Sequence, residues 1–200
     1  MFLAVAVGPT AQAQTDPQGL LDHAIDSFFA GDIEESATSF DTLVARTPTV
    51  MPRLWQRGIV LYYAQRYDDC REQFESHRTV NPNDVENAAW HFLCVASSES
   101  PEHARAALLP VGPDPREPME EIYGLFSGSQ TAAEVMAAAN GRVGAEFYAH
   151  LYVGLHAEAN GDHEEAVAHI SEAAADKYAP VGGYMHTVAR IHMSLYDGGR

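Results

Sequence analysis

The sequence predicts an all-α protein built from successive helical hairpins that stack into a solenoid. Three observations lead to this fold class. Apolar residues recur at helical spacing, residue types return every 34 positions, and Gly-Asp pairs mark the turns between helices. We expect about five hairpin units, the fourth of them shortened, followed by a C-terminal capping helix.

The 34-residue period is clearest in the first two units. It joins Leu20 with Leu54, Ala24 with Gly58, Ser36 with Cys70, Phe40 with Phe74, and Pro48 with Pro82. The same register returns later at Ala104, Leu108, Gly154, Ala166 and Ile170. Because a period of this length is typical of repeat proteins, we predict a single domain over 16–197. Its units are placed at 17–50, 51–84, 85–118, 119–146 and 147–180, and its capping helix at 182–196.

Turn and capping signals separate the two helices of a unit. Gly31 and Gly161 are expected just beyond the end of a first helix, and Asp32 and Asp162 are expected to cap the next one. A glutamate follows three residues after each aspartate, in the pattern of a capping box. Because the helix dipole favours acids in the first turn, we assign none of these carboxylates to catalysis.

Two segments depart from the regular repeat. Residues 119–146 make a unit of 28 residues, with a break at residues 127–129 and a short helix over 131–139. Residues 109–118 contain four prolines and are expected to form an extended loop. Such a loop either carries function or bridges an irregular repeat.

The second unit resembles the tetratricopeptide-repeat (TPR) family. Leu54, Gly58 and Leu61 stand at first-helix positions of the family pattern, and Cys70, Phe74 and Pro82 stand at second-helix and terminal positions. Trp55 lies one residue from the usual tryptophan, and Arg57 replaces the usual leucine. The resemblance covers about residues 17–196. The chain is broadly similar to exported TPR adaptors of bacterial envelopes. It implies a concave face, formed by the first helices, on which partner peptides bind.

An apolar stripe marks the candidate binding face in the first two units. Positions i, i+4, i+7 and i+8 share one side of a helix. Leu21, Ile25, Phe28 and Phe29 have this spacing, and Trp55, Ile59, Tyr62 and Tyr63 repeat it 34 residues later. Together with Arg53, these residues form the predicted partner-binding groove. The alternative is that the aromatic side chains pack against a neighbouring helix or subunit.

Negative charge is spread along the whole chain. Asp and Glu number 28 and Lys and Arg number 12, which gives a net charge of −16. Nucleic acids and anionic lipids require clustered cations, so we expect neither as a partner. No apolar run approaches the roughly 18 residues of a membrane helix, so no membrane insertion is expected. The expected partner is a protein or a peptide.

Catalytic and cofactor motifs are absent from the sequence. It contains no G-x-S-x-G, H-E-x-x-H, Walker or G-x-G-x-x-G pattern, so we expect no enzyme activity and no cofactor. Histidines occur in pairs spaced by six residues, which turn a helix by about 600° and so point to different sides. A metal site assembled between helices, from His150 or His156 with His186 or His192, is the alternative.

The two cysteines, Cys70 and Cys94, are interpreted as small buried residues and not as a disulfide. The alternative is that they pair if the protein is exported. Residues 1–15 begin with an apolar stretch that leads to Ala11-Gln12-Ala13, and this resembles the end of a secretory signal with its cleavage site. We interpret them as the remnant of such a signal or as a disordered tail. The first interpretation implies export to the periplasm or cell envelope, and the second a cytoplasmic protein.

These features together indicate a non-catalytic adaptor or scaffold that binds a protein or peptide through the groove of its N-terminal units. Two alternatives stand beside this interpretation. One is a homo-oligomeric scaffold in which the stripe is a subunit interface. The other is a metal- or small-ligand-binding helical protein that uses the C-terminal histidines.

Overall fold

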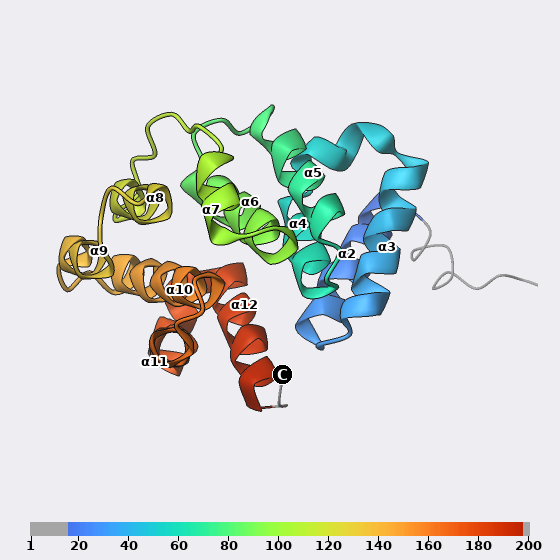
Figure 1. The fold of residues 1–200 in the computed structure, drawn as a ribbon. Coiled ribbons are helices and arrows are strands. Elements are labelled where there is room, and N and C mark those ends of the chain that lie inside the picture. Colours follow the sequence, from blue (N-terminus) through green and yellow to red (C-terminus); the bar gives the residue numbers. More distant parts are fainter. Residues whose placement is uncertain (1–15, 198–200) are drawn as a thin grey trace, which may run out of the picture.

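The computed structural model describes residues 16–197, and all of their regular structure is helical (Figure 1). No strand occurs in this range, which confirms the all-α prediction. The helices are α2 (Pro17–Phe29), α3 (Ile33–Arg46), η1 (Pro48–Arg53), α4 (Trp55–Tyr63), α5 (Tyr67–Arg78), α6 (Val85–Ser98), α7 (Pro101–Ala106), α8 (Met119–Ser127), α9 (Ala132–Ala139), α10 (Val143–Ala159), α11 (His163–Ala173), η2 (Asp176–Tyr178) and α12 (Ala179–Asp197). The predicted signal remnant at 1–15 lies outside the described residues.

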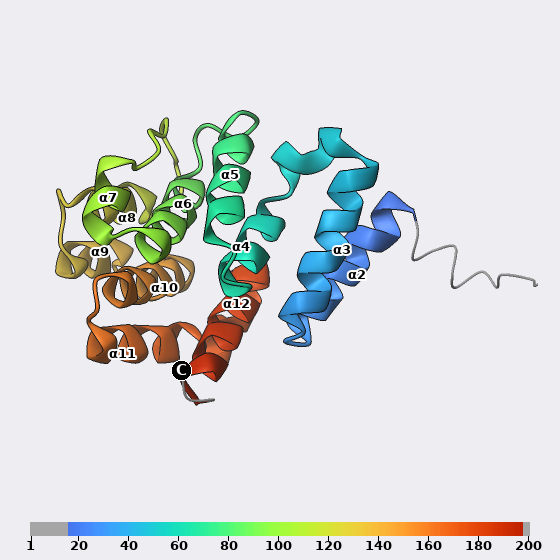
Figure 2. The ribbon, with the colours of Figure 1, turned by 45° about the vertical axis from the view of Figure 1, so that its right-hand side comes forward.

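Neighbouring helices are paired, and the pairs follow one another in an arc. α2 packs on α3, α4 on α5, α6 on α7, α8 on α9, and α10 on α11. The arc runs from α2 and α3 through α4–α7 to the C-terminal hairpins (Figures 1 and 2). α12 then turns back and lies against α10, α11 and α2, so the last helix of the arc meets the first.

Close contacts between the two helices of a hairpin recur at the positions of the 34-residue period. A Cβ atom on Gly58 would lie 2.5 Å from the ring of Phe74, and one on Gly154 would lie 2.8 Å from Ile170. In the first hairpin the Ser36 hydroxyl donates to the Ala24 carbonyl across 2.7 Å. Small residues therefore occupy these first-helix positions because the second helix crosses there at short range.

The predicted caps are present in the structure. The Asp32 carboxylate accepts a hydrogen bond from the Glu35 backbone N–H, and the Asp162 carboxylate accepts one from that of Glu165. At these two sites the structure shows only the aspartate half of the expected capping box. A two-way box forms instead at the start of α9, where Thr131 and Glu134 each accept a bond from the other's backbone N–H.

The middle of the chain is less regular than the ends. α7 has only 6 residues, and the Pro-rich segment that follows it contains no helix until Met119, as predicted for an extended loop. α8 and α9 form the short hairpin expected within 119–146. α10 begins at Val143, four residues before the predicted start of the fifth unit, because its helix continues unbroken from the preceding turn.

α12 is divided by a sharp change of backbone direction at Gly183. This residue has φ 50° and ψ −129°, a conformation that costs least at glycine because it has no Cβ. The residues before Gly183 run along α10 and the cavity described below. The residues after it form the long helical part that reaches α2.

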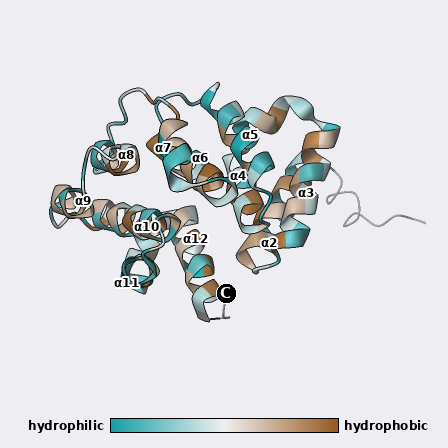
Figure 3. Cartoon of the chain, viewed as in Figure 1, coloured by the Kyte–Doolittle hydropathy of each residue, from teal (hydrophilic) through white to brown (hydrophobic). Residues whose placement is uncertain are grey.

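The hydrophobic core runs through the whole arc and not through separate hairpins. Buried aromatic residues from the start, the middle and the end of the chain belong to one contact cluster, for example Phe40, Phe92 and Phe147. Hydrophilic residues are frequent along α5 (Figure 3), where the apolar Cys70 and Phe74 are buried together with the polar Gln73 and His77. Among the described helices, none has both the length and the apolar content needed to cross a membrane.

Candidate functional site

The nine residues of the predicted groove lie in different environments. Phe28, Ile59 and Tyr63 are buried in the core. Phe29 is 42% exposed and Arg53 is also exposed. The remaining four are partly buried and pack against the core cluster: Leu21, Ile25, Trp55 and Tyr62.

α12 lies across the aromatic part of the predicted groove. The ring of Tyr184 stacks on that of Phe28 with centroids 5.9 Å apart, and meets Phe29 at 5.0 Å and Trp55 at 4.9 Å. A helix of the same chain therefore packs on part of the stripe, which is the arrangement stated above as the alternative. We call the concave side of the arc, on which the predicted groove lies, the inner face. Only the part of this face that α12 leaves uncovered can receive another molecule.

A second contact joins α12 to α4 deeper in the structure. The Tyr63 hydroxyl lies 3.0 Å from His192 Nδ1, and His192 Nε2 lies 2.6 Å from the Glu158 carboxylate. Tyr63, His192 and Glu158 come from α4, α12 and α10, so this chain of polar contacts ties three helices together. We call the group formed by Phe28, Tyr63 and His192 the sealed region, and Tyr184 lies at its edge.

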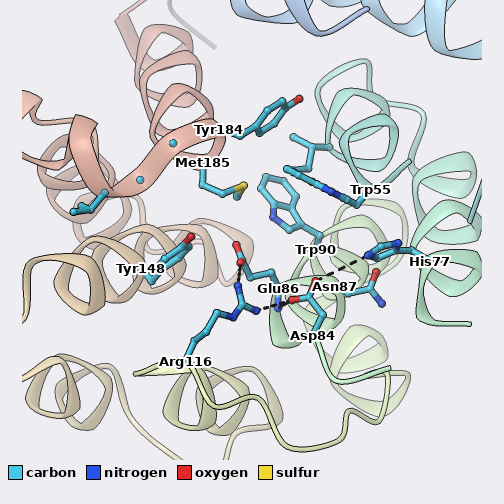
Figure 4. Close-up of a pocket in the computed structure, with 14 residues that line it drawn as sticks. Trp55, His77, Asp84, Glu86, Asn87, Trp90, Arg116, Tyr148, Tyr184 and Met185 are labelled. Carbon is cyan, nitrogen blue, oxygen red and sulfur yellow. Dashed lines mark hydrogen bonds and ion pairs between the residues drawn. The ribbon is translucent and has the colours of Figure 1, made fainter. Parts of the chain in front are cut away.

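Beside the sealed region lies a cavity of about 420 Å³ (Figure 4). Its walls come from α4, α5, α6, α10, α12 and the Pro-rich loop. The labelled lining residues are Trp55, His77, Asp84, Glu86, Asn87, Trp90, Arg116, Tyr148, Tyr184 and Met185. The volume lies within the range of cavities that bind small molecules or single side chains.

One wall of the cavity carries a cluster of carboxylates around Arg116. Its guanidinium contacts Asp84 at 2.8 Å, Glu86 at 2.5 Å and Asp114 at 2.6 Å. On the opposite side of Glu86, the Tyr152 hydroxyl donates to the carboxylate across 2.6 Å. The loop at 109–118 is thus anchored to the start of α6 through Arg116, and also through Asp114, whose carboxylate accepts a hydrogen bond from the Val85 backbone N–H.

The environment changes the proton affinities of these groups in identifiable directions. Burial raises the pKa of Glu86, although Arg116 and Tyr152 act in the opposite direction. Burial and the nearby Glu86 raise the pKa of Tyr148 to about 12. Hydrogen bonding to Asp114, together with the charge of Glu86, raises the pKa of Arg116 further above its usual value. The arginine is therefore permanently charged.

Four buried polar atoms of residues that line the cavity have no hydrogen-bond partner among the described residues: His77 Nε2, Asn87 Oδ1, Trp90 Nε1 and the Tyr184 hydroxyl. The two most deeply buried of these residues are Trp90, which is 1% exposed, and Asn87, which is 3% exposed. The Asn87 amide nitrogen is satisfied, because it donates to the Phe74 carbonyl across 3.2 Å. Unpaired buried polar groups are uncommon in proteins and require an explanation.

Cys70 and Cys94 form a disulfide, contrary to the prediction that they are separate buried thiols. The prediction that both are buried is correct. Cys70 lies on α5 and Cys94 on α6, with Cα atoms 5.9 Å apart. Helical spacing alone did not reveal the pair, because adjacent antiparallel helices bring these positions together. The bond fixes α6, which carries Glu86, Asn87 and Trp90, to the hairpin before it.

Three of the C-terminal histidines that were considered for a metal site contact protein groups instead. His150 pairs with His169 across 3.1 Å between Nδ1 atoms, His186 lies 3.1 Å from the Ala175 carbonyl, and His192 belongs to the sealed region. In residues 16–197 no three His, Cys, Asp or Glu side chains are grouped so that they could hold a metal ion.

Several cavity residues were not predicted from the sequence. Glu86, Asn87 and Trp90 lie at the start of the third unit, where the stripe positions hold alanine and leucine. Arg116 lies in the Pro-rich loop and Tyr148 on α10. The one signal in the sequence was Arg116, a charged residue between prolines. The other cavity residues come together only because the arc closes, and no local pattern indicates this.

Comparison of the sequence with protein-family models gives no match, and comparison with curated proteins gives none either.

Proposed function

We propose that this chain is a TPR-like solenoid with no catalytic activity, which binds a segment of another protein on its inner face. Gly58 and Gly154 hold the same place in the second and fifth predicted units, and at each of them the second helix of the hairpin crosses at short range. This agreement supports the proposed architecture. The observation that carries the function is the cavity. It combines aromatic walls with four buried polar atoms that have no hydrogen-bond partner among the described residues, on the part of the inner face that α12 leaves uncovered.

The position of the cavity also favours a protein segment as ligand. Exposed apolar residues lie near it, with Val181 at its edge 43% exposed and Phe29 beyond Tyr184 42% exposed. A segment with one side chain in the cavity would cover these residues as it crosses α12. Of the predicted groove, we therefore propose that only the part around Trp55 binds the segment. The residues of the sealed region are not proposed to bind it.

Site-specific photo-crosslinking in the native cell tests this proposal. A photo-reactive amino acid is placed at Trp55, in the cavity, and in a matched variant at Val80, which is 45% exposed and outside it. We expect the same protein to be crosslinked from position 55 in repeated experiments and not from position 80. Equal crosslinking from both positions contradicts the proposal. A crosslink to a second copy of this chain would instead identify a homo-oligomeric scaffold.

We further propose that the protein is exported. Disulfides form and persist in oxidising compartments, and the Cys70–Cys94 bond is consistent with such an environment. Thiol alkylation of intact cells, followed by mass spectrometry of this chain, measures the redox state directly. Full oxidation in an envelope fraction is the expected result, and reduced cysteines in a cytoplasmic fraction would contradict it.

A further inference from the structure

The charged wall of the cavity is built to accept a cation and not an anion. Asp84 and Glu86 line the cavity, and together with Asp114, which does not line it, they surround one guanidinium. Each nitrogen of Arg116 already donates to a carboxylate: Nε to Asp114, Nη1 to Glu86 and Nη2 to Asp84 and Asp114. Within residues 16–197, Arg116 is the only arginine or lysine that lines the cavity, so these residues offer no free arginine or lysine to an anionic ligand.

The aromatic walls suit the same kind of ligand. The rings of Trp55, Trp90, Tyr148 and Tyr184 line the space next to the carboxylates (Figure 4). The face of an aromatic ring attracts a cation, most strongly at tryptophan, and planar guanidinium groups also stack on such rings. Aromatic rings beside a carboxylate therefore form a recognised arrangement for an ammonium or guanidinium group.

Two of the unpaired polar atoms point to a peptide as the source of that cation. Trp90 Nε1 is a donor and needs an acceptor, whereas Asn87 Oδ1 is an acceptor and needs a donor. A bare metal ion supplies no acceptor for the indole N–H. A peptide supplies a backbone carbonyl and N–H groups close to its charged side chain, so it can satisfy both atoms.

We propose that the cavity binds the charged end of an arginine or lysine side chain from the partner segment. This inference rests on the proposed function, since it specifies the chemistry of the segment that the inner face binds. Glu86 and Asp84 provide the negative charge, Trp55 and Trp90 provide the aromatic walls, and the peptide backbone pairs with Trp90 Nε1 and Asn87 Oδ1.

Calorimetric titration of the full, oxidised chain with four probes tests the inference. The probes are a blocked Gly-Gly-Arg-Gly-Gly pentapeptide, the same peptide with citrulline for arginine, its lysine analogue and free arginine amide. Citrulline has nearly the shape of arginine without its charge. We expect the arginine and lysine peptides to bind roughly 10-fold or more tightly than the citrulline peptide, as for loss of a charged hydrogen bond.

Protein variants locate the site. Glu86→Gln keeps the size of the side chain and removes its charge, and we expect it to weaken arginine-peptide binding roughly 10-fold or more. Trp55→Leu tests the aromatic wall without touching the carboxylates. Glu34→Gln, on the exposed first turn of α3, is the matched control and should bind as wild type. Thermal unfolding of each variant establishes that it is folded.

The outcomes separate this inference from the proposed function. Equal binding of the citrulline and arginine peptides, or no binding of any probe, overturns the cation site. A partner crosslinked at position 55 would still support segment binding in either case. Free arginine amide that binds as tightly as the peptide, with no partner crosslinked, keeps the cation site and overturns the peptide source.

Discussion

The inner face of this protein has two neighbouring regions that share the helices α4 and α12 but differ in burial. α4 supplies Tyr63 to the sealed region and Trp55 to the cavity. Tyr63 is 4% exposed, and α12 supplies His192 opposite it, whereas Trp55 is only partly buried. Two residues of one helical stripe therefore differ in burial, although α12 packs a ring against each of them.

The largest expected effect compares these two residues directly. Tyr63→Ala removes a buried ring that contacts Phe28, Trp90 and His192, and we expect the free energy of unfolding to fall by about 3–5 kcal/mol. Trp55→Ala should cost only about 1–2 kcal/mol, because its ring already contacts solvent. Urea unfolding followed by circular dichroism measures both values. Similar losses in the two variants would show that the regions do not differ as described.

Removal of the disulfide tests whether this bond keeps α6, which lines the cavity, in place against α5. The bond closes a loop with a sequence separation of 24, and such loops contribute about 3 kcal/mol to the free energy of unfolding. We expect Cys70→Ala/Cys94→Ala to lose about that amount and to bind ligand less well, because α6 carries Trp90 and Glu86. A reducing agent should destabilise wild type and leave the double variant unchanged. A response of the double variant to reductant would contradict this assignment.

The packing behind the cavity is expected to be sensitive to acid. Burial lowers the pKa of His156 from 6.5 to about 4, and its ring packs against Phe92 and Phe126. The folded state therefore binds fewer protons than the unfolded state between these values, so stability is present above pH 6.5 and falls as the pH drops toward 4.

Between pH 7.5 and pH 5 we expect His156 to account for about 2 kcal/mol of lost stability. Denaturant unfolding at a series of pH values, with wild type and His156→Gln, isolates this contribution. The variant should lose correspondingly less stability on acidification. Parallel curves for the two proteins would show that the pKa of His156 is the same in the folded and unfolded states, which contradicts the prediction.

The smallest expected effect concerns the bend that positions α12 between the two regions. Gly183→Ala places a Cβ in open space but at φ 50°, so we expect a backbone cost of about 1–2 kcal/mol. Gly144→Ala, which also has open space but lies inside α10, is the matched control and should stabilise by about 0.5 kcal/mol. An unchanged free energy of unfolding for Gly183→Ala would show that α12 can pack against α2 without this backbone conformation.

Local signals in the sequence predicted much of the fold. The paired helices, the aspartate caps at 32 and 162, the short helix at 131–139 and the extended Pro-rich loop all depend on interactions within a few residues or on a repeated pattern. The disulfide was missed because it depends on contact between two helices. The predicted groove included residues against which α12 packs, such as Phe28, and no local pattern indicated that contact.

The sequence by itself determined that the chain is helical, that its helices pair, and where small residues allow close crossing, because backbone hydrogen bonds and side-chain periodicity are local properties. Only the tertiary structure decided which part of the inner face is open. That outcome depends on α12 meeting α2 and on Arg116 reaching Glu86 across 30 residues, and no local pattern records where a chain returns on itself.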